Sequence, residues 1–179
     1  RERAAGRSRG LTGRASGYGV PMTGEARAVA ALDASGISYT LTRHGPVNSL
    51  VEAAAARGVR PEDIVKTIVV RRGEGDHLFV LVPGGRQISW PKLRALLGVN
   101  RLSLPDAAQA RAVTGYERGT ITPFGSLAAL PVIADASVTG RPVSIGAGAH
   151  GVAALVDADA LVGVLAATVA DVTDAAAGA

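Results

Sequence analysis

The sequence predicts an α+β domain in which a mixed, largely antiparallel sheet is flanked by helices. Helix-like and strand-like segments are interspersed along the chain, and several strand candidates are separated only by turns of hairpin length. Such turns are too short for the crossovers that a regular parallel βαβ sheet needs. The chain has 179 residues, enough for one domain with a proper core, and shows no internal repeat. We therefore expect a single domain over residues 22–179.

The spacing of hydrophobic residues, together with residues typical of helix ends and turns, predicts the helices and strands in chain order. Gly36 is a helix stop, Ser49 and Glu52 form a capping box, and Ser89 is a candidate N-cap. The turn at 72–76 is a hairpin signal. The expected helices are 24–35, 49–57, 90–97, 105–113 and 157–166, with a short helical turn at 61–63. The expected strands are 37–42, 64–71, 77–82, 100–104, 131–134, 141–145 and 151–156, followed by a last segment over 168–172.

Charge is distributed unevenly. Residues 1–21 carry five Arg and one Glu, are rich in Gly and Ser, and have no hydrophobic period, which predicts a disordered N-terminal extension. Residues 22–101 hold eleven basic and seven acidic side chains, whereas residues 102–179 hold three and seven. The domain is therefore neutral as a whole. Neutrality argues against broad electrostatic binding of nucleic acid, but the basic half retains the capacity to hold one short backbone segment.

Composition also excludes several classes of protein. The absence of cysteine excludes disulfides, a thiolate nucleophile and Cys-ligated zinc. The three histidines lie far apart without ligand-like spacing, so no metal site and no cofactor are predicted. No apolar run approaches the roughly 18 residues that span a bilayer, and no apolar segment follows the Arg-rich start. We expect a cytoplasmic protein without membrane contact.

The loop 114–125 is the most unusual stretch of the chain. It holds three glycines and Pro123 within twelve residues. Glycine permits close approach of a ligand to the backbone, and the N–H groups of Thr120, Ile121 and Thr122 are able to point together into a pocket. Such a loop binds oxyanions or carbonyls without a catalytic side chain. On spacing alone, a tight connection between two strands is the commoner explanation.

Four further positions attract attention. Lys66 is the only charge within an apolar strand, which suits either a cation that meets an anion or a side chain that extends to solvent. His44 lies in a loop and is as compatible with a surface role as with a base. Asp135 follows a strand, where structural capping is the commoner role. The Gly-x-Gly-x-x-Gly pattern at 146–151 precedes a strand rather than a helix, so a dinucleotide site is rejected.

Taken together, four collinear motifs resemble the YbaK/EbsC family, standalone relatives of the editing domain of bacterial prolyl-tRNA synthetases. The resemblance covers residues 24–172. The motifs are Val65-Lys66-Thr67-Ile68-Val69-Val70, Thr114-Gly115-Tyr116 through Gly119-Thr120-Ile121-Thr122-Pro123-Phe124-Gly125, Leu130-Pro131-Val132-Ile133-Ala134-Asp135, and Gly146-Ala147-Gly148-Ala149-His150-Gly151.

The resemblance implies a mostly antiparallel sheet that closes toward a barrel, and hydrolysis of mischarged aminoacyl-tRNA without a metal. The expected substrates are Cys-tRNA(Pro) and Ala-tRNA(Pro), with prolyl-tRNA synthetase as a candidate partner. Lys66 would meet the phosphate or ribose of the terminal adenosine, and the backbone of Gly119, Thr120 and Ile121 would hold the aminoacyl end. Lys66 and Gly119 are thus the expected catalytic positions. The expected substrate-binding residues are His44, Thr67, Tyr116, Thr120, Ile121, Pro123, Asp135, Gly146 and Gly148.

The sequence departs from the family pattern at two places, and other functions compete. His44 stands where some members carry a tyrosine, and Ala149-His150 stands where relatives often have a Lys-Arg pair. The second departure removes positive charge that would meet tRNA phosphates. The main alternative is a non-catalytic module that binds aminoacyl-tRNA or an aminoacyl-adenylate beside a synthetase. A third possibility is general RNA binding through residues 1–21.

Overall fold

The structure is a computed structural model that describes residues 21–177. The extension predicted over 1–21 lies outside this range except for Pro21, so its disorder stays a prediction. Within the described range the helices are α1 (Gly24–Ser35), α2 (Leu50–Arg57), α3 (Trp90–Leu97), α4 (Ala107–Thr114) and α5 (Ala158–Val164). The strands are β1 (Tyr39–Arg43), β2 (Ile64–Gly73), β3 (Asp76–Pro83), β4 (Arg86–Ile88), β5 (Val132–Asp135), β6 (Pro142–Gly146), β7 (Val152–Asp157), β8 (Thr168–Ala170) and β9 (Thr173–Ala175).

The strands confirm the predicted α+β class. Seven of them form one sheet in the order β1-β7-β6-β2-β3-β5-β8, and β4 pairs with β9. Four pairings are antiparallel, whereas β2 with β6, β3 with β5 and β5 with β8 are parallel. The sheet is therefore mixed with antiparallel pairs in the majority. Within residues 21–177 no ladder joins β1 to β8, and closure into a barrel stays a prediction.

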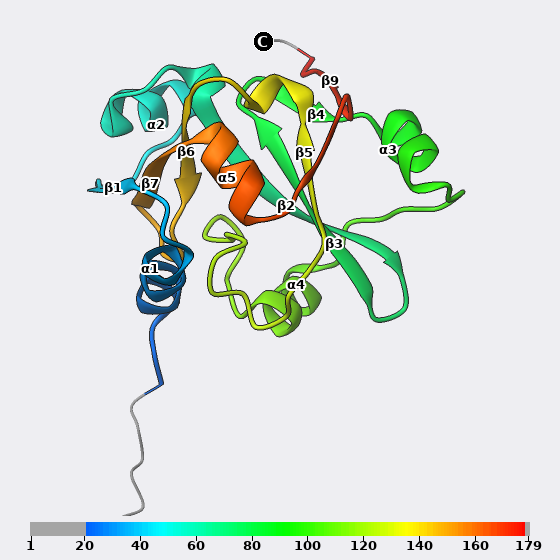
Figure 1. Cartoon of the computed structure of the whole chain (residues 1–179), viewed down its shortest axis with the longest axis horizontal. Coiled ribbons are helices and arrows are strands. Elements are labelled where there is room, and N and C mark those ends of the chain that lie inside the picture. The colour runs from blue at the N-terminus through cyan, green and yellow to red at the C-terminus, as the bar shows by residue number, and fades with distance from the viewer. Residues whose placement is uncertain (1–20, 178–179) are drawn as a thin grey trace, which may run out of the picture.

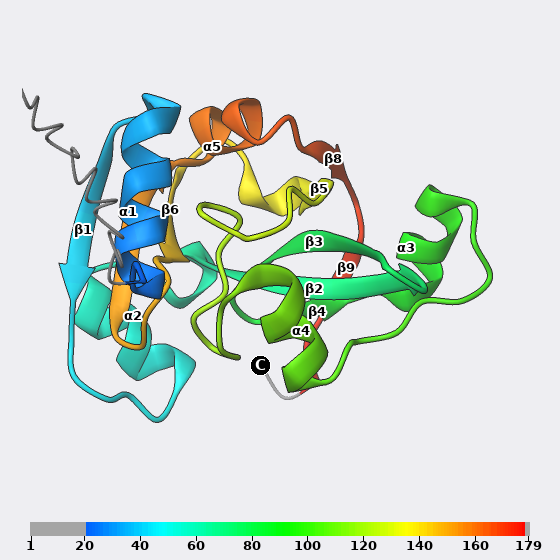
Figure 2. The same cartoon turned by 90° about the horizontal axis from the view of Figure 1, so that it is seen from below.

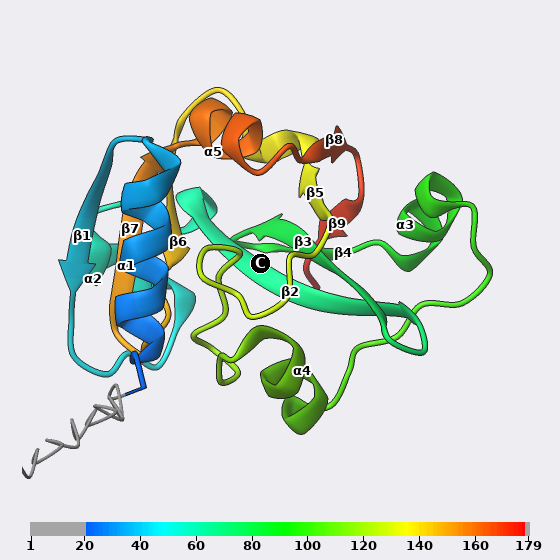
Figure 3. The same cartoon turned by 60° about the horizontal axis from the view of Figure 1, so that its bottom comes forward.

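The long strands β2 and β3 link two halves of the molecule. Figure 1 shows them crossing the centre, with β1, β6 and β7 beside α1 at one end and α3 at the other. In Figure 2, α5 and α4 lie on opposite sides of the β2–β3 pair. The loop that follows α4 lies between α1 and α4, in front of β2 (Figure 3). This arrangement brings the glycine-rich loop close to the strand that carries Lys66.

Two hydrophobic cores lie on the two faces of β3. Phe79 and Leu81 pack into the larger core with residues of α1, β6, β7 and α5, whereas Leu78, Val80 and Val82 pack into a second core with α3. Because successive side chains of a strand point to opposite faces, the positions 78–82 of β3, which lie between the two cores, must all be apolar. The prediction of a central strand over 77–82 is thereby confirmed.

Most element ends follow their predicted signals. Gly36, Gly58 and Gly98 end helices in the left-handed conformation, and the Ser49 side chain accepts from the Glu52 N–H. Ser89 occupies the N-cap position of α3, as predicted, but its side chain makes no capping bond to the helix. The strand expected over 100–104 was wrong, since it is reduced to a single bridge between Arg71 and Ser103.

The described helices are all too short or too polar to cross a membrane.

The glycine-rich loop is anchored to α1 through Tyr116 and Arg27. Tyr116 is 1% exposed, and its hydroxyl donates to the Phe124 carbonyl at 2.6 Å. The Arg27 guanidinium lies 4.8 Å from the centre of the Tyr116 ring and donates to the carbonyls of Gly115 and Gly125 at 2.8 and 3.2 Å. These bonds hold both ends of the loop against one helix.

We predict that Tyr116→Phe lowers the free energy of unfolding by about 1–3 kcal/mol, because it leaves the buried Phe124 carbonyl without a donor. Urea unfolding measures the loss. Tyr39→Phe is the matched control, because the Tyr39 hydroxyl donates to Asp33 at the surface and its removal should cost less. Equal losses in the two variants would contradict the anchoring role of Tyr116.

Candidate functional site

The site begins where β2 separates from β6. The two strands are paired only at Ile64↔Ser144 and Val65↔Ile145, and the next pairing on that edge of β2 is the bridge from Arg71 to Ser103. Between Val65 and Arg71 this edge has no strand partner among residues 21–177. Arg71 exchanges both of its backbone bonds with Ser103. Because backbone groups alternate between the two edges of a strand, those of Thr67 and Val69 face the same open edge.

A small hollow of about 140 Å³, which we call the central hollow, lies at this opening. It gathers five of the predicted site residues, although they come from three distant parts of the sequence. Its lining residues are Arg57, Ile64, Val65, Lys66, Thr67, Gly119, Ile121 and Gly146. The sheet edge, the glycine-rich loop and the end of β6 therefore meet at one place.

Lys66 stands at the rim of the central hollow without a carboxylate partner. Its ammonium donates to the Arg86 carbonyl at 2.8 Å, and it forms no ion pair with a described residue. The side chain as a whole is exposed, yet protein surrounds part of the ammonium, and this desolvation lowers the pKa of Lys66. One of its three donors is used by Arg86, which leaves two for a ligand.

Thr67 contributes an unusual hydroxyl. Its Oγ1 is buried and has no hydrogen-bond partner in the part of the chain that the structure describes. A buried hydroxyl without a partner costs about 1–3 kcal/mol, so such groups are rare unless a ligand or water satisfies them. Thr67 therefore fits the predicted substrate-binding role.

Three larger hollows adjoin the central one and share its lining. The apolar hollow, about 400 Å³, is lined by Thr67, Ile68, Val69, Leu104, Pro105, Ala110, Arg118, Gly119 and Ile121. The histidine hollow, about 470 Å³, is lined by His44, Gly45, Pro46, Val47, Arg57, Gly119, His150 and Gly151. The tryptophan hollow, about 310 Å³, is lined by Lys66, Ile68, Gln87, Ile88, Trp90 and Leu104. Gly119 lines three of the four, so it occupies their junction.

Of the three residues whose backbone was expected to hold the aminoacyl end, Gly119, Thr120 and Ile121, only two have an N–H group that the described part of the chain leaves available for a ligand. The Thr120 N–H already donates to the Glu117 carbonyl at 3.0 Å, and its hydroxyl donates to the same carbonyl at 2.8 Å. Thr120 is buried in this turn and does not offer its N–H to a ligand. The N–H groups of Gly119 and Ile121 have no acceptor within residues 21–177. These two remain available for a developing oxyanion.

His44 and Arg57 form a pair between the central and histidine hollows. Arg57 Nε donates to His44 Nε2 at 3.2 Å, and His44 Nδ1 lies 2.7 Å from the Gly45 carbonyl. The two contacts are satisfied together when Nδ1 carries the proton and Nε2 accepts. His44 is therefore at the site, as predicted, and it orients an arginine.

Three other predicted residues lie away from the four hollows. Tyr116 is a core residue, Pro123 lies beyond the junction in the same loop, and Gly148 adopts a φ of 82° in close contact with α1. A β-carbon at Gly148 would lie 2.3 Å from the Gly24 carbonyl oxygen. The second glycine-rich turn therefore needs glycine for packing, and only Gly146 reaches the central hollow.

Asp135 fastens the end of β5 rather than lining a hollow. It is 2% exposed and accepts from the N–H groups of Ser137 and Val172, each at 3.0 Å. Burial alone would raise the pKa of Asp135, but hydrogen bonds from Ser137, Val172 and Thr173 outweigh it and the pKa lies below its usual value. The carboxylate therefore stabilises the fold above the pKa of unfolded aspartate, about 3.9, and this stabilisation is lost as pH falls through the lower folded pKa.

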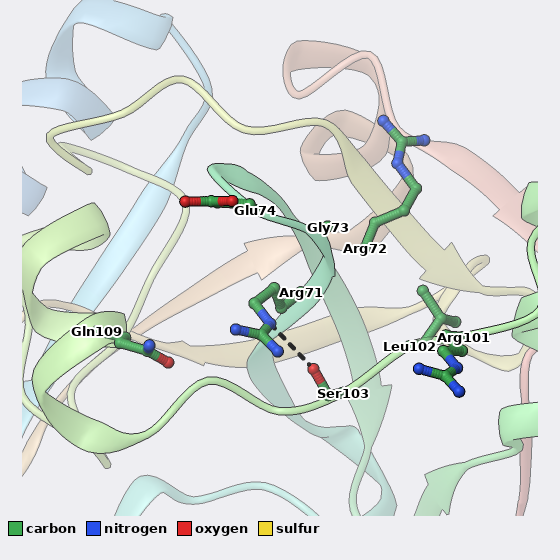
Figure 4. Close-up of a pocket in the computed structure, with 8 residues that line it drawn as sticks. All are labelled: Arg71, Arg72, Gly73, Glu74, Arg101, Leu102, Ser103 and Gln109. Atoms are coloured by element: carbon green, nitrogen blue, oxygen red, sulfur yellow. Dashed lines mark hydrogen bonds between the residues drawn. The ribbon is translucent and has the colours of Figure 1, made fainter.

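A fifth hollow, which we call the arginine hollow, lies at the far end of β2, roughly 16 Å of strand from Lys66. It has a volume of about 650 Å³ and is lined by Arg71, Arg72, Gly73, Glu74, Arg101, Leu102, Ser103 and Gln109. Figure 4 shows Arg71 donating to Ser103. Arg72 is paired with Asp76 at 2.7 Å, and Glu74 supplies a carboxylate nearby. This hollow contains none of the predicted site residues.

The described part of the chain holds no group of three or more His, Cys, Asp or Glu side chains arranged to bind a metal ion.

Comparison with known proteins decides the family. The family profile described as "Aminoacyl-tRNA editing domain" matches residues 44–163, two thirds of the chain. The chain belongs to this family. It is an aminoacyl-tRNA deacylase, and the resemblance to the YbaK/EbsC group is confirmed. The matched segment runs from His44 to beyond β7, so it includes every predicted site residue.

Individual relatives agree with this assignment. The prolyl-tRNA editing protein ProX of Acetoanaerobium sticklandii is 28% identical over 118 residues, 63% of this chain and 72% of that protein. A proline–tRNA ligase of Desulfovibrio desulfuricans is 37% identical over 93 residues, 52% of this chain but only 16% of the ligase. A crystal structure of a candidate trans-editing enzyme for prolyl-tRNA synthetase superposes with a TM-score of 0.76 and 25% identity, covering 86% of this chain and 99% of that one.

Sequence reasoning missed the site residues that lack a motif. Arg57 was seen only as the last residue of a helix, where a cation is favoured by the helix dipole. Leu104, Pro105 and Ala110 were assigned to an expected strand and helix, yet they form one wall of the apolar hollow. No local signal marks these positions, because their role arises from the packing of α4 beside β2.

We predict that Gly119→Ala lowers the deacylation rate strongly but lowers the free energy of unfolding only modestly. Gly119 has a φ of 87°, and left-handed backbone costs other residues about 1–2 kcal/mol. An added β-carbon would lie in ordinary contact with His150 Cε1, at 3.4 Å, so the strain comes from the positive φ, and its relief would displace the N–H at the junction of the hollows. The expected fall in kcat/KM is about tenfold or more.

The matched control is Gly36→Ala, because Gly36 has a φ of 76°, no neighbour within 4 Å, and a place at the end of α1. It should lose similar stability in urea unfolding and keep its deacylation rate. Equal rates for the two variants would contradict a role for the Gly119 backbone.

Proposed function

We propose that this editing domain acts in trans on mischarged tRNA(Pro) and removes a small amino acid, cysteine or alanine. The names of the relatives support the choice of tRNA, since one is a prolyl-tRNA editing protein and others are proline–tRNA ligases. Prolyl-tRNA synthetase is then the proposed protein partner, and the cytoplasm, where tRNA is charged, is the proposed location.

One observation carries the proposal: the open edge of β2 brings Lys66, Thr67, Gly119 and Ile121 to one small hollow. An aminoacyl ester is already activated toward hydrolysis. Positioning and stabilisation of the oxyanion therefore suffice, and no strong side-chain nucleophile is required.

In the proposed reaction, water attacks the carbonyl carbon of the ester and the carbonyl oxygen becomes an oxyanion. The N–H groups of Gly119 and Ile121 donate to this oxyanion. The bond between the carbonyl carbon and the ribose oxygen then breaks, and the ribose oxygen leaves as a hydroxyl after taking up the proton lost by the water. The products are the free amino acid and uncharged tRNA.

The surrounding groups orient the substrate in this scheme. The carbonyl oxygens on the open edge of β2, those of Thr67 and Val69, accept from the α-ammonium group of the amino acid. The small side chain enters the apolar hollow against Val69, Leu104 and Ile121. An apolar wall distinguishes one methylene by only about 1–3 kcal/mol, so discrimination among small amino acids should be modest.

The test is deacylation of tRNA(Pro) charged with Cys, Ala or Ser, with Pro-tRNA(Pro) as the control and EDTA in every reaction. We expect multiple turnovers on at least one mischarged species and little on Pro-tRNA(Pro). Stoichiometric protection without turnover would instead indicate a binding module. Activity that requires added metal would contradict the metal-free scheme.

We predict that Lys66→Ala and Lys66→Met lower kcat/KM on the preferred substrate by about 100-fold. Either change removes the charge-assisted hydrogen bond from Lys66 to the phosphate or ribose of the terminal adenosine. Stability should change little, since the ammonium is partly desolvated and unpaired. Lys92→Ala is the matched control: Lys92 pairs with Asp171 and Asp174 outside the hollows. A Lys66 variant with the normal rate would contradict the proposed contact between Lys66 and the phosphate or ribose of the terminal adenosine.

A further inference from the structure

Arg57 is a half-buried cation without an anionic partner. Three other arginines in the same half of the chain are paired with carboxylates: Arg60 with Asp63 at 2.8 Å, Arg72 with Asp76 at 2.7 Å, and Arg43 with Glu25. Arg27 and Arg86, which have no carboxylate partner either, use their terminal nitrogens on backbone carbonyls. No carboxylate among residues 21–177 forms an ion pair with Arg57. Its burial lowers the pKa of Arg57, since desolvation penalises the charged form. The C-terminal end of α2 supplies only a partial compensating charge.

Lys66 lines the same hollow and is in the same situation. Its ammonium bonds to a carbonyl rather than to a carboxylate, and it too is partly desolvated. Two unpaired cations beside one hollow of about 140 Å³ repel each other and cost free energy. An anion from outside the chain that binds between them would offset this repulsion.

His44 holds the arginine ready for such an anion. It accepts from Arg57 Nε at 3.2 Å, while its own Nδ1 is 2.7 Å from the Gly45 carbonyl. The two terminal nitrogens of the guanidinium have no acceptor within the described chain. A planar guanidinium with both terminal nitrogens available matches two oxygens of a phosphate.

We propose that Arg57, oriented by His44, is a second phosphate-binding residue that works with Lys66 on the phosphodiester 5′ to the terminal adenosine. This inference rests on the proposed function. The aminoacyl end of the substrate carries a positive α-ammonium, which two cations would repel, and the adenine and ribose are neutral. The phosphate is therefore the part of the substrate whose charge suits this hollow.

The geometry also separates the two ends of the terminal nucleotide. Thr67, Gly119 and Ile121 line both the central and the apolar hollow, so the ester lies at their shared wall. The phosphate then occupies the cationic side, and the amino acid occupies the apolar side. Bound in this way, the phosphate fixes the register of the ester against the N–H groups of Gly119 and Ile121.

The test compares two small substrates, the alanyl ester of adenosine and the alanyl ester of adenosine 5′-monophosphate. For the unmodified protein we expect kcat/KM to be about 10- to 100-fold higher on the phosphorylated ester, the value of one charged hydrogen-bonded contact. Arg57→Ala should lower this ratio by about tenfold, mainly through KM, with any remaining preference due to Lys66, and Arg57→Lys should restore part of the loss. Arg101→Ala, which removes an exposed charge from the distant arginine hollow, should keep the ratio.

Binding gives a readout that does not depend on hydrolysis. Calorimetry should show tighter binding of adenosine 5′-monophosphate than of adenosine, and Arg57→Ala should lose most of this difference while its thermal unfolding stays cooperative. One outcome would separate this inference from the proposed function. If no ester or tRNA is hydrolysed, but the unmodified protein prefers adenosine 5′-monophosphate to adenosine and Arg57→Ala loses most of that preference, the phosphate site stands and the proposed function fails. If Arg57→Ala keeps the full preference for phosphate in both assays, or if the unmodified protein has none, the inference is overturned.

Discussion

The separation of β2 from β6 after Val65 is the constraint on which the site depends. Up to Val65 the two strands are paired in parallel, and beyond it β2 continues with one edge open as far as Arg71. Unpaired strand edges are normally covered or blocked because they invite pairing with other chains. Here the glycine-rich loop and α4 approach the edge without pairing to it, so the opening becomes a set of connected hollows rather than a ladder.

The fold supplies rigidity around this opening. β3 is buried on both faces and holds β2 in one register over seven pairs, from Val65 to Arg71, while Tyr116 and Arg27 hold the loop against α1. The backbone N–H groups of Gly119 and Ile121 are thus presented by a fixed scaffold. For an activated ester, fixed donors are an adequate source of catalysis, because they need no reorganisation as charge develops. In the proposed scheme, Lys66 and Arg57 have the separate role of binding the phosphate of the terminal nucleotide.

Much of this could be predicted from the sequence. Alternating apolar residues and glycine stops identified the helices and the long strands, because these signals act within a few residues. The strands 86–88 and 173–175 were missed. Each has three residues and pairs only with the other, which is far away in the sequence, so no local pattern marks either of them. Of the predicted site residues, Lys66, Thr67, Gly119, Ile121 and Gly146 belong to motifs and line the central hollow together, and their part in catalysis or binding stays a prediction.

The errors at the site have a physical pattern. Tyr116, Asp135 and Gly148 share the same motifs but serve the core, and a motif does not distinguish a residue that touches a ligand from one that supports it. Thr120 offers no N–H because its turn closes on Glu117. Arg57 has no motif, and its role depends on the absence of a carboxylate around it, which only the folded structure reveals.

A crystal structure with a stable analogue would test the central claim most directly, namely that the open edge of β2 binds the terminal aminoacyl nucleotide. The analogue is adenosine 5′-monophosphate with alanine joined to the ribose by an amide in place of the ester. The account predicts the phosphate within hydrogen-bond distance of Lys66 Nζ and the Arg57 guanidinium, and the alanyl carbonyl oxygen beside the Gly119 N–H. A phosphate bound in the Arg71–Arg101 hollow, with the central hollow unchanged, would contradict it.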